Sequence, residues 1–452
     1  ARQELILQPR GGPADAGGDI RYWVDLTSRA TRWPDGRLEV EVSVENRAPR
    51  DIAWVDVEIA CGEPFTSRVE SVAQGETRSE RVSLPLGTAC DGYTVAVGGA
   101  AYSGFPFTAE KEIPAKYGID QSVADTIGVG GVFRFLRTGP VQHQFYRDME
   151  SHCPNAFALN YTNPMAMLTW LHTTDSSIRN VGLCHSVQGT TKMLADLIDV
   201  PYDEVTYQVA GINHMAWVLE FRRGSEDLYP RIREAAETTE RDLVRFEMMR
   251  QFGRFVTESS RHNSEYLPYF RRTDELLDMY DLMPRERRQE QRRRDGWRAW
   301  MNGEDGAAMP EPELVLSHEY ATAIVEAMVT NTPFLFNGNV MNNGTIPNLP
   351  GECCVEVPCV ADSFGVRACH VGELPPQLAA LNRSNVSVQE LAVRAVIDRD
   401  REAAFHACAV DPLAAASVSL PDMRRMFDEL WDAERELLRW FDDGEIPEIA
   451  AP

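Results

Sequence analysis

The chain has 452 residues, with 45 Lys or Arg against 69 Asp or Glu, so its formal net charge is −24. This length predicts two or three domains with sizeable apolar cores. The acidic balance argues against nucleic acid and anionic membranes as partners, and no apolar run is long enough to span a bilayer. Nine cysteines without a regular framework indicate a reducing compartment, so we expect a cytoplasmic protein.

Residues 20–110 have the pattern of an all-β segment. The run Leu38-Glu-Val-Glu-Val-Ser-Val44 alternates strictly between apolar and polar side chains, and further short runs follow between Gly, Pro and Asn or Asp breaks. Short strands at this spacing are typical of a β-sandwich. Cys61 and Cys90 would be able to pair across such a sandwich, but two free thiols are expected in a reducing compartment.

The pattern changes after this segment to a mixture of strands and helices. Between residues 155 and 221 short apolar runs alternate with helical periodicity, which predicts an α/β fold, and helical patterns dominate the rest of the chain. Gly128, Gly130 and Gly131 precede a helical stretch. They are typical of a tight loop, and they would also let backbone N–H groups approach an anion.

Two segments carry side chains that bind metals. Cys184 follows a short apolar run, at the expected end of a strand, where α/β sheets place their ligands. His214 lies in the alternating run Tyr207 to Phe221, which is typical of one half-buried strand. A thiolate and an imidazole on neighbouring strand ends would leave coordination positions open for a substrate. The alternative is that Cys184 is a small side chain of the core.

Two other groups are interpreted without a functional role. A second set of metal-binding side chains has a spacing that matches no standard zinc site, so we expect core residues there: Cys353, Cys354, Cys359, Cys369 and His370. The Arg-rich run 284–298 is expected to be a solvated helix face or an oligomer contact.

Several sequence blocks follow one another in an order typical of one enzyme family. They include Ala124-Asp-Thr-Ile-Gly-Val-Gly-Gly131, Gly182-Leu-Cys-His-Ser-Val-Gln-Gly-Thr190, Ala210-Gly-Ile-Asn-His-Met215, Phe255-Val-Thr-Glu-Ser-Ser260 and Cys353-Cys-Val-Glu-Val357. In these blocks residues 104–452 resemble glycoside hydrolase family four, the NAD- and manganese-dependent glycosidases, and in particular its α-galactosidase (melibiase) and α-galacturonidase branch.

The resemblance implies a redox route to glycoside hydrolysis, unlike the two-carboxylate scheme of most glycosidases. In this route NAD takes a hydride from the sugar C3, and the resulting ketone makes the C2 proton acidic. A divalent metal polarises the sugar oxygens while a base removes that proton. The leaving group departs, water adds, and the cofactor returns the hydride.

The resemblance also implies roles for individual residues. Cys184 and His214 match the family's metal ligands, and Asn163 matches its substrate-binding asparagine. His185 follows the metal-binding cysteine and is assigned to protonation of the leaving group.

Tyr266 is the best match to the family's tyrosine base, and Tyr269 is the second candidate. A nearby metal would lower the pKa of a tyrosine toward neutrality. Without the resemblance, Tyr266 would be interpreted as an aromatic side chain of the core.

The first hundred residues depart from the family. No Gly-x-Gly-x-x-Gly follows a strand there, so either a different domain replaces the dinucleotide-binding opening or this half has diverged beyond recognition. We expect a β-sandwich-like segment over residues 1–110, the remainder of a Rossmann-like α/β domain over 111–221, and a helix-rich C-terminal substrate and oligomerisation domain over 222–452. Residues that bind NAD are not identified.

The expected function is hydrolysis of a small α-galactoside or α-galacturonide with NAD and Mn²⁺ by a homo-oligomer, as a dimer or a tetramer. Two alternatives remain open. One is a non-catalytic carbohydrate- or partner-binding protein that has lost NAD binding. The other is a plain dehydrogenase that acts on a free sugar and accumulates NADH.

Overall fold

The computed structural model describes residues 109–282 and 319–444 and, before them, residues 4–6, 24–32, 38–46, 52–61, 63–73, 75–84 and 94–102. The chain forms two compact units, one with Ala1–Ala109 and Asp432–Arg439 and the other with Glu110–Trp431 and Trp440–Ile446. Cys90 and the Arg-rich run 284–298 lie outside the described residues, as does the side chain of Cys61. Among the described helices, none has the length and apolar character needed to cross a membrane.

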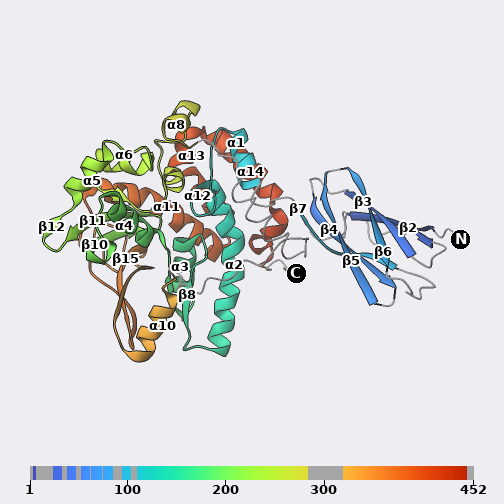
Figure 1. Ribbon diagram of the computed structural model, residues 1–452, viewed down its shortest axis with the longest axis horizontal. Coiled ribbons are helices and arrows are strands. Elements are labelled where there is room, and N and C mark those ends of the chain that lie inside the picture. The colour runs from blue at the N-terminus through green and yellow to red at the C-terminus, as the bar shows by residue number, and fades with distance from the viewer. Residues whose placement is uncertain are drawn as a thin grey trace. The chain divides into compact units, whose positions relative to one another are not determined.

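The first unit contains two antiparallel sheets, drawn in blue in Figure 1. One has the order β1-β2-β3-β6, with bounds Glu4–Ile6, Val24–Arg32, Leu38–Asn46 and Thr77–Leu84. The other has the order β5-β4-β7, with bounds Glu63–Val72, Ile52–Cys61 and Thr94–Tyr102. In β3 the side chains of Val40, Val42 and Val44 are buried and those between them are partly exposed. The predicted alternation and the all-β segment are therefore confirmed.

The second unit contains a nine-stranded mixed sheet. Its strand order is β12-β11-β10-β15-β14-β9-β8, and in addition β13 pairs with β11 and β16 pairs with β15. Among its described strand pairs only β8 and β9 run parallel, and β8 ends the order. The bounds are Phe157–Asn160 (β8), Arg179–Gly182 (β9), Val205–Ile212 (β10), Met215–Arg223 (β11), Glu226–Asp227 (β12), Phe255–Val256 (β13), Phe334–Met341 (β14), Cys354–Asp362 (β15) and Gly365–Ala368 (β16).

Helices surround this sheet, and the long helix α2 packs against α3, α11 and α12 (Figure 1). The bounds of the helices are Ala109–Lys116 (α1), Gly128–His152 (α2), Met165–Thr174 (α3), Ser186–Leu197 (α4), Tyr229–Ala236 (α5), Leu243–Phe252 (α6), Ser260–Asn263 (α7), Asp274–Met279 (α8), Ala321–Thr330 (α10), Pro376–Asp398 (α11), Arg401–Ala409 (α12), Pro412–Ser417 (α13) and Leu420–Ala433 (α14). Short 3₁₀ helices cover Tyr202–Glu204 (η2), Ser264–Tyr266 (η3), Arg435–Leu437 (η4) and Arg439–Phe441 (η5). The expected fold class, a partial Rossmann-like sheet with a helix-rich remainder behind an all-β segment, is confirmed.

One predicted strand is in fact a hairpin. The run Tyr207 to Phe221 folds back on itself, because β10 and β11 pair with Ile212 opposite Met215 and leave only Asn213 and His214 in the turn. The first four residues of β11, Met215 to Val218, are all buried. Because both faces of this segment are buried, its apolar pattern continues through the turn and does not reveal it. The prediction that Cys184 and His214 lie at the ends of neighbouring strands is also wrong, because β14 and β15 lie between β9 and β10 in the sheet.

Three of the cysteines near residue 360 belong to the core. Cys353, Cys354 and Cys359 are fully buried on or beside β15, as expected, whereas Cys369 is only partly buried and His370 is exposed, so the expectation is wrong for these two. Burial raises the pKa of the Cys359 thiol to about 12, so this thiol is neutral at physiological pH.

Candidate active site

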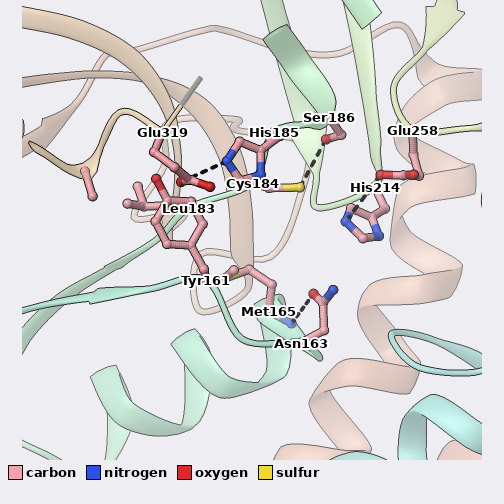
Figure 2. Close-up of a pocket in the computed structure, with 11 residues that line it drawn as sticks. Tyr161, Asn163, Met165, Leu183, Cys184, His185, Ser186, His214, Glu258 and Glu319 are labelled. Atoms are coloured by element: carbon pink, nitrogen blue, oxygen red, sulfur yellow. Dashed lines mark hydrogen bonds and ion pairs between the residues drawn. The ribbon is translucent and has the colours of Figure 1, made fainter. Parts of the chain in front are cut away.

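A cavity of about 600 Å³ opens where the parallel strands β8 and β9 end, as Figure 2 shows. Ligand sites at the carboxyl ends of parallel strands are a general feature of α/β sheets. The cavity is lined by Tyr161, Asn163, Met165, Leu183, Cys184, His185, Ser186, His214, Glu258, Glu319 and Ala321. It therefore gathers four of the five residues to which the resemblance assigned a role.

Cys184 lies directly after β9 and is held through its backbone. The Tyr320 hydroxyl accepts a hydrogen bond from the Cys184 N–H and donates one to the Cys184 carbonyl, both at 3.0 Å. The thiol donates to the hydroxyl of Ser186 at 3.4 Å. Burial raises the pKa of the Cys184 thiol, although hydrogen bonds to Ser186 oppose this shift. A bound cation would reverse this effect, because coordination stabilises the thiolate.

His214 occupies the hairpin turn between β10 and β11 with a left-handed backbone, at φ 61°. The side-chain amide of Asn263 donates to the carbonyl of His214 at 3.3 Å and so fixes the turn. Only 5% of His214 is exposed. Its Nδ1 has no hydrogen-bond partner among the described residues, and a buried polar atom without a partner is costly unless a ligand satisfies it.

Glu258 completes the group, although the sequence did not single it out. It follows the short strand β13 with a left-handed backbone at φ 72°, and its Oε2 lies 3.4 Å from Nε2 of His214. Burial works against its ionised form, but the nearby His262 and His214 lower the pKa of Glu258 below its usual value. Its carboxylate is therefore ionised and available as a ligand.

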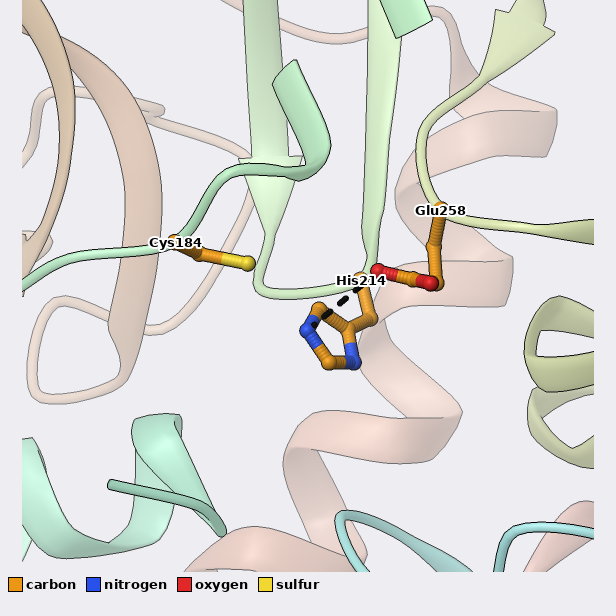
Figure 3. A group of neighbouring side chains, drawn as sticks. All are labelled: Cys184, His214 and Glu258. Atoms are coloured by element: carbon orange, nitrogen blue, oxygen red, sulfur yellow. Dashed lines mark ion pairs between the residues drawn. The ribbon is translucent and has the colours of Figure 1, made fainter. Parts of the chain in front are cut away.

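The three side chains form a donor set that fits a divalent metal ion (Figure 3). The Cys184 sulfur, a ring nitrogen of His214 and a carboxylate oxygen of Glu258 lie within 4.8 Å of one another, and no other group of this kind occurs among the described residues. Thiolate, imidazole and carboxylate are all ligands of first-row divalent metals. Three protein ligands would leave further positions open for substrate oxygens.

His185 lies beside the metal candidates and has an acidic partner. Its Nε2 is 3.0 Å from a carboxylate oxygen of Glu319, and its ring stacks on Tyr161 at 5.2 Å between centroids. Its side chain is 49% exposed, so it is accessible from the cavity and from solvent. Glu319 was also not anticipated, because it meets His185 only through the fold.

Asn163 lines the same cavity at the start of α3. Its side-chain oxygen accepts a hydrogen bond from the N–H of Met165 at 3.2 Å. This bond holds the side chain in the loop that follows β8, on the wall of the cavity.

The two tyrosine candidates for the base have different environments. Tyr266 is 1% exposed and its ring lies 6.4 Å from that of His214, whereas Tyr269 is 41% exposed and stacks on Phe252. The Tyr266 hydroxyl has no hydrogen-bond partner among the described residues. Burial, followed by the nearby anions, of which Glu258 contributes most, raises the pKa of Tyr266 well above its usual value.

A second layer of polar groups lies behind these residues. The ring of His262 lies between two carboxylates, with Nδ1 3.8 Å from Glu258 and Nε2 3.6 Å from Asp125. Glu356 on β15 is fully buried, and burial raises its pKa well above the usual value. His262 lies next to the ligand candidate Glu258, and neighbours of this kind orient ligands and tune a bound metal.

The glycine cluster Gly128, Gly130 and Gly131 lies in the first turn of α2, where it serves the packing of the chain itself. A Cβ atom on Gly130 would meet Ala124 at 2.7 Å, and one on Gly131 would meet the Thr126 backbone at 2.6 Å. The structure places these glycines in the first turn of a helix and not in the expected tight loop, and the close packing there explains their small size. The described residues hold no glycine-rich loop after a parallel strand, which is the feature that binds a dinucleotide pyrophosphate.

Comparison with known proteins identifies the family of the chain. The family description "Family 4 glycosyl hydrolase" matches residues 96–200, and "Family 4 glycosyl hydrolase C-terminal domain" matches residues 209–414. An α-galactosidase of Bacillus subtilis (strain 168) is 44% identical over 334 residues, which cover 72% of this chain and 77% of that protein. The chain belongs to glycoside hydrolase family 4.

Two further proteins are similar to the chain at lower identity. An α-galacturonidase of Thermoanaerobacterium saccharolyticum (strain DSM 8691 / JW/SL-YS485) is 28% identical over 72% of this chain and 77% of its own length. The crystal structure of a 6-phospho-α-glucosidase from gut microorganisms in complex with NAD and Mn²⁺ has a TM-score of 0.57 at 22% identity, and covers 73% of this chain and 77% of that chain. At this identity the structural likeness shows a shared fold. The all-β strands that precede residue 96 lie outside the family match.

Proposed function

We propose that this family 4 chain is a metal-dependent glycosidase that hydrolyses α-galactosides, with α-galacturonides as the other candidate substrates. The observation that carries the proposal is the group of Cys184, His214 and Glu258, whose ligand atoms lie within 4.8 Å beside a cavity that also holds Asn163 and His185. The 44% identity to an α-galactosidase favours the galactoside.

The three ligand candidates would hold Mn²⁺ or a similar divalent ion. Bound there, the ion would polarise the carbonyl oxygen of a sugar that is oxidised at C3 in the redox route, and so make the C2 proton acidic. The same ion would neutralise the anions that raise the pKa of Tyr266, and so bring its phenolate within reach near neutral pH.

The other residues have the following proposed roles. Tyr266 accepts the proton from the sugar C2, because its hydroxyl is buried beside His214 without another partner among the described residues. His185 donates a proton to the leaving oxygen, and its contact with Glu319 at 3.0 Å orients the imidazole at the cavity. Asn163 binds a sugar hydroxyl at the wall of the cavity.

NAD remains part of the proposal, because the similar 6-phospho-α-glucosidase structure contains NAD together with Mn²⁺. In the redox route the nicotinamide would supply the hydride chemistry. The described residues do not include a cradle for its pyrophosphate, so no residue is assigned to NAD binding. The experiment below decides whether the cofactor is required.

The test is release of nitrophenol from 4-nitrophenyl α-galactoside under reducing conditions, with Mn²⁺ and NAD⁺ added separately and together. We expect activity only when both are present. Equal rates without either addition would contradict the redox route, and a requirement for Mn²⁺ alone would retain the metal site but remove NAD. Parallel assays with 4-nitrophenyl α-galacturonide distinguish the two candidate substrates.

A second function is favoured by one specific observation. The strand β8 ends the described sheet, and no dinucleotide loop occurs among the described residues, so a carbohydrate- or partner-binding protein without NAD is the alternative. Calorimetric titration with NAD⁺ separates the two. Binding in the micromolar range supports the glycosidase, whereas absence of heat together with binding of galactose supports the binding protein.

A further inference from the structure

A second and larger cavity lies beside the candidate active site and shares two residues with it. Its volume is about 1130 Å³, and His185 and Glu319 line both cavities. These two side chains form the ion pair described above, so they mark the boundary between the two spaces. Because His185 is the proposed proton donor, the leaving oxygen of a substrate must lie at this boundary. The rest of the leaving group then has the second cavity in front of it.

One face of helix α4 forms a wall of this second cavity. The lining residues recur at three- and four-residue intervals, which is the spacing of a single helix face: His185, Gln188, Gly189, Lys192, Met193, Asp196 and Leu197. The opposite face, with Val187, Leu194 and Ala195, is buried in the core. The wall begins next to Cys184, and the helix extends about 12 Å along its axis from Gly189 to Leu197.

Gly189 gives independent support for a ligand at this wall. Glycine in a helix interior is destabilising by about 1 kcal/mol relative to alanine, so a helical glycine calls for a reason. A Cβ atom at Gly189 would meet nothing within 4 Å, so packing within the protein does not require it. At Gly182, in contrast, a Cβ would collide with Met165 and Thr169. The open space at Gly189 is the second cavity, where a ligand is able to approach the helix closely.

The chemistry of the lining matches an uncharged sugar. Tyr202, which is partly exposed, supplies aromatic surface against which the C–H face of a sugar ring packs. Lys192 donates to Asp196 at 2.8 Å, so these charges compensate each other along the wall. With the proton-donating His185 counted beside Lys192 and Arg241, the basic groups of the lining only balance its three carboxylates. The lining therefore has no excess of positive charge to attract an acidic galacturonate chain.

We propose that this second cavity binds the leaving group of an α-galactoside, and that this leaving group is a neutral mono- or disaccharide lying against the α4 face. The inference rests on the proposed function for its assignment of the leaving group to the His185 side of the active site. Binding of the free sugar to the cavity does not depend on catalysis, so the two hypotheses are tested separately.

The first test compares Gly189→Leu with the wild type on two substrates with Mn²⁺ and NAD⁺ present. Raffinose has sucrose as its leaving group, whereas α-galactosyl fluoride has a single atom. We expect the ratio of kcat/KM for raffinose to that for the fluoride to fall at least tenfold. The new side chain improves helix propensity and has free space in the empty cavity, so the variant is expected to fold.

Gly351→Leu is the matched control, because a Cβ at Gly351 also meets nothing within 4 Å and this exposed turn lies outside both cavities. We expect the ratio in this control to match the wild type. An unchanged ratio in Gly189→Leu, or an equal fall in both variants, would overturn the inference and leave the glycosidase function standing.

The second test measures binding of sucrose itself by ligand-observed NMR. Sucrose is expected to bind the wild type and Gly351→Leu, and its binding to Gly189→Leu is expected to fall at least tenfold. If sucrose binds in this pattern but neither substrate is hydrolysed, the assignment of the cavity to sugar binding stands and the proposed function is rejected. No binding to the wild type, or equal binding to all three proteins, would reject the cavity assignment.

Discussion

The Nε2 atom of His214 lies 3.4 Å from Oε2 of Glu258, and both residues adopt the left-handed backbone conformation that is uncommon for side chains of this kind. Each such residue costs of order 1 kcal/mol, and strained backbone of this type concentrates at functional sites. Two segments distant in the sequence thus both hold strained conformations at the point where their side chains meet. This relationship supports Glu258 as a third metal ligand beside Cys184 and His214.

Replacement of Glu258 by Gln should weaken Mn²⁺ binding. The amide keeps the size of the side chain but removes the charge, and even changes outside the direct ligands cost about 10- to 100-fold in metal affinity. We expect a loss of at least tenfold by isothermal titration. Glu220→Gln is the control, because Glu220 is 51% exposed on β11 and pairs with Arg222. Equal Mn²⁺ affinity in the Glu258 variant and the control would contradict the assignment.

Cys184→Ser should abolish activation by Mn²⁺. Serine preserves the shape of the side chain but replaces a thiolate ligand with a hydroxyl that stays protonated near neutral pH. Hydrolysis of 4-nitrophenyl α-galactoside measured against Mn²⁺ concentration checks this, with circular dichroism as the control for folding. A folded variant with the activation curve of the wild type would remove Cys184 from the site.

Tyr266→Phe should separate stability from activity. The buried Tyr266 hydroxyl has no partner among the described residues, so its removal is expected to leave the melting temperature unchanged or raised. Loss of the proposed base should lower kcat by about 10²- to 10⁴-fold. Tyr269→Phe, at a position that is 41% exposed, is the control and should retain activity. A fully active Tyr266→Phe enzyme would move the proton transfer to another residue.

Asp120→Asn should destabilise the loop that carries Tyr266. The guanidinium of Arg271 is fully buried, pairs with Asp120 and donates to the Ser264 hydroxyl at 3.1 Å, at the start of η3. Because loss of one partner leaves a buried charge unpaired, we expect about 2–4 kcal/mol less stability in urea unfolding. Asp422→Asn breaks the exposed pair with Arg425 and should cost less than about 1 kcal/mol. Equal effects of the two changes would refute this account of Arg271.

Stability should fall in mild acid because of His172. Burial, with the charge of His143 in addition, lowers the pKa of His172 to about 3, while an unfolded histidine titrates near 6.5. Between these values the unfolded chain binds the proton and the folded chain does not, so stability decreases as the pH falls from about 6.5 toward 3. His172→Gln should flatten this dependence in calorimetric scans between pH 4 and 7, and the exposed His406→Gln should not. A steeper dependence in the His172 variant would contradict the assignment.

The sequence predicted the elements whose signals are local. Strict alternation in residues 38–44 gave the buried valines of β3, and helical spacing after Cys184 gave α4. The turn at Asn213 and His214 was missed because the run around it is buried on both faces, so the apolar pattern continues through the turn.

The candidate site could be predicted only in part from the sequence. Cys184 and His214 were found through their residue types and the family resemblance, but β14 and β15 separate their strands in the sheet. They approach each other because the loops after β9 and β10 converge, and no local pattern encodes that convergence. Glu258 and Glu319 were missed for the same physical reason, since each meets its histidine only through tertiary packing.

The most direct test of the account is hydrolysis of 4-nitrophenyl α-galactoside in D₂O with Mn²⁺ and NAD⁺, followed by NMR analysis of the released galactose. Removal of the C2 proton by Tyr266 beside the metal site predicts that the product carries deuterium at C2, and that Tyr266→Phe abolishes this incorporation. Galactose released at the same rate with only hydrogen at C2 would contradict the account.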